Sequence, residues 1–431
     1  MVNFLCKNKR EKKVLILFLH DSTGELFVTL PFFWFLKKKL DVEIYFISSH
    51  KDILKRMNVS SRYIEMMNQI GSCHFGYLNN IKLLSNLFNS NNLIIQMSCN
   101  LGARRIDRIY YSILKKSTKL FFTHAFMLHP FNKIKNIARN NELKSFINSQ
   151  FLSFYGNKSD LLIINSEETN YFTERGWSLN ALHAVGAYGY NKDWLNYLFK
   201  SDLSKVKKED KNRSLNIFVP LRDCHNIYLT KTNYDFLICS LAEVFKFFPD
   251  FKFTIKLHPR QQPKEILEIF SKLHNVSFSN DSPFELAAKS DLTIGFWSSA
   301  LTDSVAVGTP AIEFFKHEIP HPQLVTQDDK LISLNQYLGL CLGFDNLKQL
   351  QNFLSNLNFD QLQKIQNNQY SMLIKYFNID KSYENKILGI FEDHFQKASQ
   401  AHLDQRLEKS ILILVKKFIG KIFSIPRRIF L

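Results

Sequence analysis

The stretch LTIGFWSSALTDSVAVGTPAIEFF, residues 292–315, predicts a strand, a short helix and a second strand in immediate succession. The first apolar run, 292–296, leads into two serines, which are favoured residues at the start of a helix. Gly308 and Pro310 then stop the helix before the apolar run 311–315. Both runs are predominantly apolar, which favours strands covered on both faces. The stretch therefore predicts one unit of a parallel α/β sheet.

Short apolar runs alternate with longer helical patterns over almost the whole chain. Their continuous apolar character again indicates parallel strands joined by helical crossovers. The predicted fold class is therefore α/β, with Rossmann-like, doubly wound sheets. The predicted strands are 13–19, 42–48, 92–98, 119–124, 161–165, 215–221, 251–257, 276–279, 292–296 and 311–315.

A polar, lysine-rich stretch, DLSKVKKEDKNR, interrupts this alternation near the middle of the chain. We interpret residues 191–213 as a linker between two similar domains, 1–190 and 214–395, because 431 residues suit two domains of ordinary size. Residues 396–431 are expected to form a basic C-terminal helix. Ligands of doubly wound sheets bind beyond the carboxyl ends of the strands, so the two domains should face a common cleft.

The formal net charge of +17 needs a partner that tolerates it: nucleic acid, an anionic membrane surface or an anionic substrate. A lysine- and phenylalanine-rich composition can also reflect AT-rich coding DNA, which would make part of the charge uninformative. The six cysteines show no C-x-x-C pair and read as reduced thiols of a cytosolic protein. The basic N-terminus and the apolar run 14–19 mimic a signal peptide, but the run is too short and is interpreted as the first strand.

A basic cluster lies in the C-terminal segment SILILVKKFIGKIFSIPRRIFL, residues 410–431. Lysines and arginines alternate there with apolar residues at helical spacing, and the segment holds no acid. This pattern favours a helix on an anionic membrane surface, and hence a cytoplasmic protein peripheral on the inner face of the membrane. A terminal helix packed on its own domain is the alternative. Nucleic acid is disfavoured, because it requires basic residues with exposed aromatics on one face.

Polar residues follow the predicted strands of the second domain. The strand FTIKLHPR ends at His258, and the following proline prevents helix there, which holds the imidazole at the end of the strand. Ser298 and Ser299 precede a short helix, where unpaired amides and two hydroxyls suit a phosphate. A cap needs only one serine, so a purely structural role is the alternative. Arg222 follows the first strand of this domain, where a cation could meet the phosphates of a donor.

The strand ending in HP, together with a later strand followed by SS, a short helix and GTP, resembles the GT-B glycosyltransferases. It is most similar to those of bacterial capsules and lipopolysaccharide: polysialyltransferases, Kdo transferases and CDP-glycerol glycerophosphotransferases. The resemblance implies that His258, Ser298 and Ser299 contact the nucleotide phosphate. The segment TDSVAVGTPAIEF also resembles the pattern E-A-x-A-x-G-x-P-V-I, whose acid binds the ribose, and Asp303 stands at that position. An aspartate near a helix start also has a structural explanation in the helix dipole.

The segment HDSTGELFVTLPFFWFLKKK, after the first strand, resembles the S-x-G-E segment of Kdo transferases. That resemblance implies Glu25 as the general base for the acceptor hydroxyl, with Asp21 as the second choice. A first-turn or capping acid is the structural alternative. His124 ends a predicted strand where related transferases place an acceptor-side histidine. The segment HAVGAYG, residues 183–189, resembles the last unit before the interdomain linker, and no chemistry is expected of it.

These features predict a metal-independent glycosyltransferase that moves a sugar from a nucleotide-activated donor to a surface polysaccharide or a lipid-linked acceptor. The donor is expected to be CMP-linked, with UDP- and CDP-linked donors as alternatives. The sequence has no D-x-D, Walker loop, G-x-G-x-x-G or zinc spacing, so no metal or cofactor is expected. Helix-terminal amides, His258 and Arg222 would then stabilise the departing phosphate. The alternatives are an enzyme like the non-hydrolysing UDP-N-acetylglucosamine 2-epimerases, or a non-catalytic basic protein that binds anions or nucleic acid.

Overall fold

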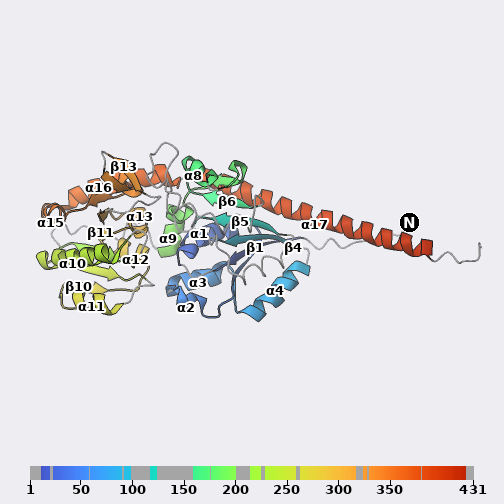
Figure 1. Ribbon diagram of the computed structural model, residues 1–431, viewed down its shortest axis with the longest axis horizontal. Helices are drawn as coiled ribbons and strands as arrows, with labels where there is room; N and C mark the ends of the chain where they lie inside the picture. The colour runs from blue at the N-terminus through green and yellow to red at the C-terminus, as the bar shows by residue number, and fades with distance from the viewer. Residues whose placement is uncertain are drawn as a thin grey trace, which may run out of the picture.

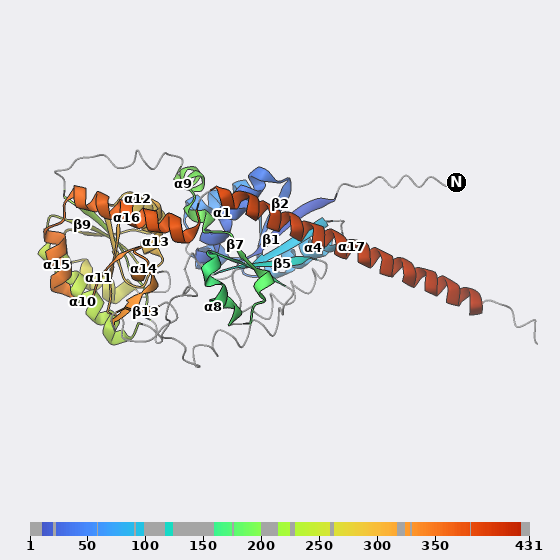
Figure 2. The same cartoon turned by 90° about the horizontal axis from the view of Figure 1, so that it is seen from above.

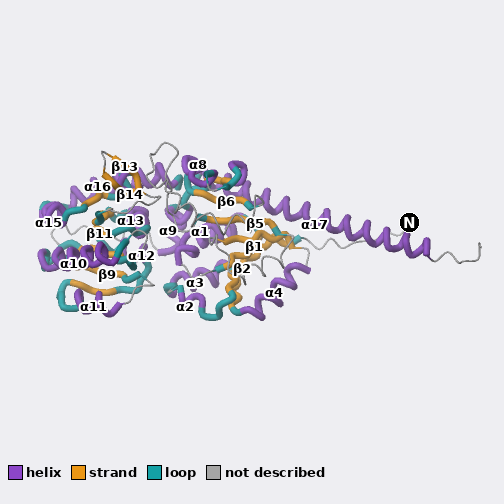
Figure 3. Tube along the Cα trace, viewed as in Figure 1, coloured by secondary structure: helices purple, strands orange, loops and turns teal. Residues whose placement is uncertain are grey.

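Two parallel β-sheets, one in each half of the chain, organise the protein in the computed structural model. Figure 1 shows the sheets next to each other, with a long C-terminal helix running away from the body, and Figure 3 shows helices on both sides of the strands. The described residues are 11–19, 23–57, 59–89, 92–98, 117–123, 159–174, 176–199, 214–224, 229–258, 263–316, 324–327, 330–379 and 381–423.

The first sheet has seven strands in the order β3-β2-β1-β4-β5-β6-β7, and all neighbouring pairs are parallel. The strand order reverses between β1 and β4. The carboxyl ends of these two strands therefore form the topological switch point, where such sheets bind ligands. The strands are β1 (Lys12–Phe18), β2 (Val42–Ser48), β3 (Ser72–Phe75), β4 (Asn92–Ser98), β5 (Thr118–Phe122), β6 (Asp160–Ile163) and β7 (Leu182–Ala184).

Helix α1 (Thr23–Lys39) is apolar around its whole circumference and buries side chains on all sides, among them Leu26 and Phe33. A helix of this kind is stable only when it is enclosed. The other helices of this domain are α2 (Ile53–Arg56), α3 (Ser61–Ile70), α4 (Tyr77–Asn89), η2 (Ser166–Glu168), α8 (Thr169–Thr173), η3 (Leu179–Ala181), η4 (Tyr188–Tyr190) and α9 (Lys192–Phe199).

Helix α9 occupies the start of the stretch that the sequence predicts as a linker. It is helical because Trp194, Leu195 and Leu198 are apolar at helical spacing, and all three are buried. The Trp194 ring packs edge-on against Trp34 of α1, with 5.7 Å between ring centroids. The first part of the predicted linker therefore belongs to the first domain, whereas residues 200–213 lie outside the described residues.

The second sheet has six parallel strands in the order β10-β9-β8-β11-β12-β15, with the switch point between β8 and β11. Every strand that the sequence predicts is present. The strands are β8 (Asn216–Pro220), β9 (Lys252–Lys256), β10 (Val276–Phe278), β11 (Leu292–Gly295), β12 (Ala311–Phe314) and β15 (Leu342–Phe344), with an antiparallel pair β13 (Leu324–Gln327) and β14 (Lys330–Ser333). The helices are α10 (Lys231–Phe247), α11 (Pro263–Phe270), α12 (Pro283–Ala288), α13 (Ala300–Ala306), α14 (Leu334–Tyr337), α15 (Leu347–Ser355) and α16 (Phe359–Phe377).

After α16 the chain returns to the first domain. The Ala187 amide donates a 2.8 Å hydrogen bond to the Phe377 carbonyl, and Asn378 Nδ2 donates one of 3.0 Å to the Ile164 carbonyl. Gly186 lies against this crossing with a φ of +74°, and a Cβ atom there would collide with the Asn378 carbonyl oxygen. Glycine is required at this close approach of two backbones.

Helix α17 (Ser382–Phe423) first packs on the first domain and then runs beyond it, as Figures 1 and 2 show. His394 anchors it, with Nε2 3.0 Å from Asp160 Oδ2 at the start of β6. The helix predicted from residue 396 is therefore the continuation of a longer helix. Among the described residues, none of the helices combines the length and the apolar character that crossing a membrane requires.

Candidate functional site

Three donor-side residues predicted from the sequence lie at one edge of the second sheet. His258 follows β9, Arg222 follows β8 and Ser298 follows β11, and these three strands are neighbours in the sheet. Arg222 Nη1 donates a hydrogen bond to the Trp297 carbonyl, which joins the ends of β8 and β11 directly. The structure therefore gathers these side chains at the switch point of the sheet.

Trp297 shapes the turn between β11 and α13. It has a φ of +49°, which costs a non-glycine residue about 1–2 kcal/mol. Its ring is buried and packs on Phe315 at 5.9 Å, while Arg222 holds its carbonyl group. Strained backbone of this kind concentrates at functional sites, where surrounding contacts maintain it. Arg222 thus supports the turn that carries Ser298 and Ser299.

The two serines of this turn differ in what they bind. Ser298 Oγ accepts a 3.3 Å hydrogen bond from the Ala300 amide, so capping accounts for this hydroxyl. Ser299 is the N-cap residue of α13, but its side chain makes no capping hydrogen bond. Both serines and His258 are half-buried. Within the described part of the chain, the Ser299 hydroxyl therefore has no structural role in the cap.

Asp303, the predicted ribose ligand, is buried in α13, with 6% of its surface exposed. Its Oδ1 accepts a 2.8 Å hydrogen bond from the hydroxyl of Tyr190, which also lies 3.0 Å from Thr302 Oγ1. Burial raises the pKa of Asp303 to about 7, and the Tyr190 hydrogen bond works in the opposite direction. Tyr190 belongs to η4 of the first domain, directly after the HAVGAYG segment. No local pattern in the sequence indicates this contact between Tyr190 and Asp303.

Glu25 lies in the first turn of α1, at the carboxyl end of β1 and so at the switch point of the first sheet. It is buried, with 2% of its surface exposed. The Phe27 ring, one half-turn further along α1, packs edge-on against Phe284 of α12, at 6.1 Å between centroids. The start of α1 therefore faces the second domain. Asp21 and His124, the other first-domain candidates, lie outside the described residues.

The domain boundary around these residues is apolar. The fully buried ring of Tyr190 packs on Phe377 at 5.3 Å and on Phe284 at 6.1 Å. Tyr63 of α3 packs on Phe27 at 4.9 Å, and one continuous core cluster contains residues of both domains. These contacts pack α12 and α16 of the second domain against the first domain.

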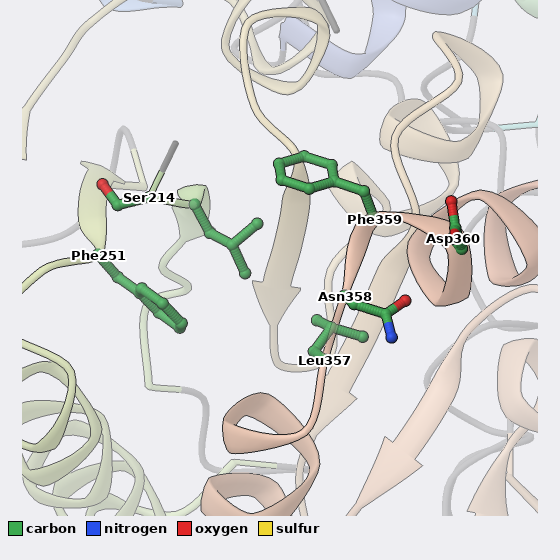
Figure 4. Close-up of a pocket in the computed structure, with 7 residues that line it drawn as sticks. Ser214, Phe251, Leu357, Asn358, Phe359 and Asp360 are labelled. Atoms are coloured by element: carbon green, nitrogen blue, oxygen red, sulfur yellow. The ribbon is translucent and has the colours of Figure 1, made fainter. Parts of the chain in front are cut away.

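A pocket of about 310 Å³ lies elsewhere in the second domain. Figure 4 shows Phe251 on one side of it and Leu357, Asn358 and Phe359 on the other. Ser214 and Leu215 also line it, and both precede the first residue of β8. The pocket is therefore at the amino end of β8, away from Arg222 and the switch point, and it is separate from the predicted donor site.

The fold resembles solved structures of nucleotide-sugar enzymes. A putative UDP-N-acetylglucosamine 2-epimerase from Listeria monocytogenes superimposes with a TM-score of 0.57 at 11% identity, covering 90% of this chain and 97% of that chain. A glycosyltransferase from Rickettsia africae gives a TM-score of 0.52 at 15% identity, covering 89% and 99%. A variant of the wall teichoic acid polymerase TagF gives 0.55 at 15% identity, covering 91% and 90%. No family model and no curated protein matches the sequence.

Two Rossmann-like domains in this arrangement define the GT-B fold. The predicted fold class is thereby confirmed. At such low identities the likeness establishes the fold, and the chemistry must be argued from the site.

Proposed function

We propose that the protein is a GT-B glycosyltransferase that binds a nucleotide-activated sugar on the second domain and its acceptor on the first. The observation that carries this proposal is the gathering of His258, Arg222 and the Ser298–Ser299 turn after three neighbouring parallel strands. Cationic and hydroxyl side chains at a switch point suit the phosphate of a nucleotide. In the proposed site these groups balance the negative charge of the departing phosphate without a metal.

The transfer step also requires a general base, and we assign this role to Glu25. The acceptor oxygen attacks the anomeric carbon of the sugar, and the bond from that carbon to the phosphate oxygen breaks. The electron pair of the broken bond leaves with the nucleotide, while Glu25 takes the proton of the acceptor hydroxyl. Glu25 suits this role because it is the acid in the first turn of α1, at the switch point of the first sheet.

Replacing His258 by alanine is expected to weaken nucleotide binding about tenfold, the effect of losing one hydrogen bond to a charged group. A thermal-shift screen with CMP, CDP, UDP and GDP identifies the nucleotide, and titration calorimetry then compares the two proteins. CMP is the expected ligand, on the resemblance to transferases that use CMP-linked donors. His183→Ala is the matched control, because His183 contacts Asp160 in the first domain. Equal nucleotide affinity in His258→Ala and the wild type would remove His258 from the donor site.

A second candidate activity is epimerisation of a UDP-linked sugar. It is supported by the structural likeness to UDP-N-acetylglucosamine 2-epimerases, with TM-scores of 0.50 and 0.57 for those from Neisseria meningitidis and Listeria monocytogenes. Incubation with UDP-N-acetylglucosamine alone separates the two activities, since epimerisation needs no acceptor. Formation of the 2-epimer would support the epimerase, whereas a transferase leaves the donor intact. A non-catalytic anion-binding protein would turn over no donor under either condition.

We further propose that the far end of α17 lies on the anionic surface of a membrane, which makes the enzyme peripheral on the cytoplasmic face. The helix continues to Phe423 after leaving the first domain (Figure 2). In its sequence Ile411, Val415 and Phe418 recur on one helical face, and the lysines of the segment, Lys416, Lys417 and Lys421, all lie outside that face, together with some of its apolar residues. This pairing suits acyl chains on one side and anionic headgroups on the other. A lipid-linked acceptor would then lie close to the first domain.

Deleting the residues after Ser410 is expected to release the protein from anionic vesicles. The deletion removes five lysines and arginines and no acid, and each basic residue near such a surface contributes about 1 kcal/mol. Co-sedimentation with phosphatidylserine-containing vesicles measures the effect, and vesicles of phosphatidylcholine alone are the control. Unchanged sedimentation of the shortened chain would show that the segment does not bind the membrane.

A further inference from the structure

The carboxylate of Asp303 is held at one oxygen and open at the other. Its Oδ1 accepts the Tyr190 hydrogen bond. Its Oδ2 accepts no hydrogen bond from any described residue. Oδ2 is also not one of the fully buried polar atoms that lack a hydrogen-bond partner in the described part of the chain. Oδ2 therefore retains contact with solvent although the residue as a whole is buried. An aspartate held in this way can accept one further hydrogen bond.

We propose that Tyr190, contributed by the first domain, is a positioning residue for the donor site: it fixes Asp303 through Oδ1 so that Oδ2 accepts a hydrogen bond from a ribose hydroxyl. This inference rests on the proposed function. Asp303 lies one turn after Ser299, on the helix that starts at the proposed phosphate site. The same short helix would thus bind a phosphate near Ser299 and a ribose near Asp303.

The position of the Tyr190 hydroxyl is set by packing. Tyr190 is fully buried, and its ring contacts Phe284 of α12 and Phe377 of α16, both in the second domain. A ring enclosed in this way keeps a single rotamer. Because the tyrosine enters from the first domain, the geometry of Asp303 depends on how the two domains meet. Donor binding would therefore be sensitive to a residue that never touches the donor.

The hydroxyl also controls the charge of Asp303. Burial raises the pKa of Asp303 to about 7, and the Tyr190 hydrogen bond opposes that rise by stabilising the carboxylate. Tyr63 and Glu285 are the other titratable groups facing this region, from α3 and α12, and burial and nearby carboxylates raise the pKa of the Tyr63 hydroxyl. The hydroxyls of Tyr63 and Tyr190 are therefore both neutral near pH 7. Removing the Tyr190 hydroxyl should raise the pKa of Asp303 further and leave less carboxylate at neutral pH.

Nucleotide titrations between pH 6 and 9 test the proposal, with CMP, CDP and UDP and their 2′,3′-dideoxy analogues as probes. The wild type should prefer the ribonucleotide about tenfold, the effect of a hydrogen bond to a charged acceptor, and Asp303→Asn should reduce that preference. Tyr190→Phe should move the rise of affinity to higher pH, so that affinity falls most at pH 7 and recovers by pH 9. Taking the difference from the wild type at each pH cancels the titration of the nucleotide itself.

Tyr188→Phe is the matched control. Tyr188 lies on the same short helix, and its hydroxyl donates to Glu384 at 3.3 Å instead of to Asp303. Its pH profile of nucleotide binding should follow that of the wild type. A Tyr190→Phe profile that also follows the wild type would overturn the proposal.

Unfolding by urea gives a readout without nucleotide. The pKa of Asp303 is raised on folding from 3.8 to about 7, so its stabilising contribution is complete below pH 3.8 and is lost as the pH rises to about 7. Asp303→Asn should remove that part of the pH dependence, and Tyr190→Phe should extend it to higher pH. If the wild type binds none of the nucleotides, the proposed function and this inference both fail. If it binds them but Tyr190→Phe changes neither profile, only the inference fails.

Discussion

Gly186→Ala should lower the free energy of unfolding by about 2–5 kcal/mol, the sum of a left-handed backbone penalty and an overpacked contact. Gly186 has a φ of +74°, and a Cβ atom there would collide with the Asn378 carbonyl oxygen and lie 3.0 Å from that of Phe377. Both obstacles are backbone atoms, so no side-chain rotation relieves them. The hydrogen bonds from Ala187 to Phe377 and from Asn378 to Ile164 hold the crossing in place.

Gly339→Ala is the matched control, because Gly339 has a similar φ of +71° but its nearest neighbour is the flexible Met372 side chain at 3.5 Å. It should show only the backbone penalty of about 1–2 kcal/mol. Urea titrations of the two variants and the wild type measure the difference. Equal losses in the two variants would mean that the approach of Gly186 to the crossing does not contribute to stability.

The strands were predictable because most central strands carry a continuous apolar run, as in VLILF of β1 and LIIQM of β4. The missed strands lie at the edges of the sheets or outside them. β3 reads SCHF with exposed or half-exposed residues, and β7 contributes only Leu182–Ala184. Such short, partly polar segments take their conformation from the neighbouring strand, which a local pattern does not contain.

The candidate site likewise has a part that the local sequence predicts and a part that depends on the folded chain. The positions of His258 and Ser298 after β9 and β11 were predictable because turn chemistry marks the residues that follow a strand, whereas their role in the site stays a prediction. Tyr190 meets Asp303 across 113 residues of sequence, and Arg222 meets Trp297 across 75. The positive φ of Trp297 leaves no trace in the residue type, since tryptophan rarely adopts it. Contacts of this range depend on how the domains pack, so they emerge only from the folded chain.

Glu25→Gln should lower the rate of transfer by about 10²–10⁴-fold, the usual contribution of a general base, while nucleotide affinity stays close to that of the wild type. Glutamine keeps the size of the side chain, so the packing of the start of α1 is preserved. Glu25 is the one acid in the first turn of α1, and it lies on the first domain, apart from the donor residues of the second sheet. Separate losses are therefore expected: the Glu25 variant loses transfer and the His258 variant loses binding.

Nucleotide release from the donor in the presence of acceptor measures the transfer rate. Glu168→Gln is the control, because Glu168 is fully buried and accepts a hydrogen bond from the Asn165 amide in a capping box. That variant should lose stability but keep its rate per folded molecule. If Glu25→Gln retained most of the wild-type rate, Glu25 would be a structural first-turn acid, and the base would have to be sought elsewhere, with Asp21 as the next candidate. If it lost nucleotide affinity as well, the division of acceptor and donor between the two domains would be wrong.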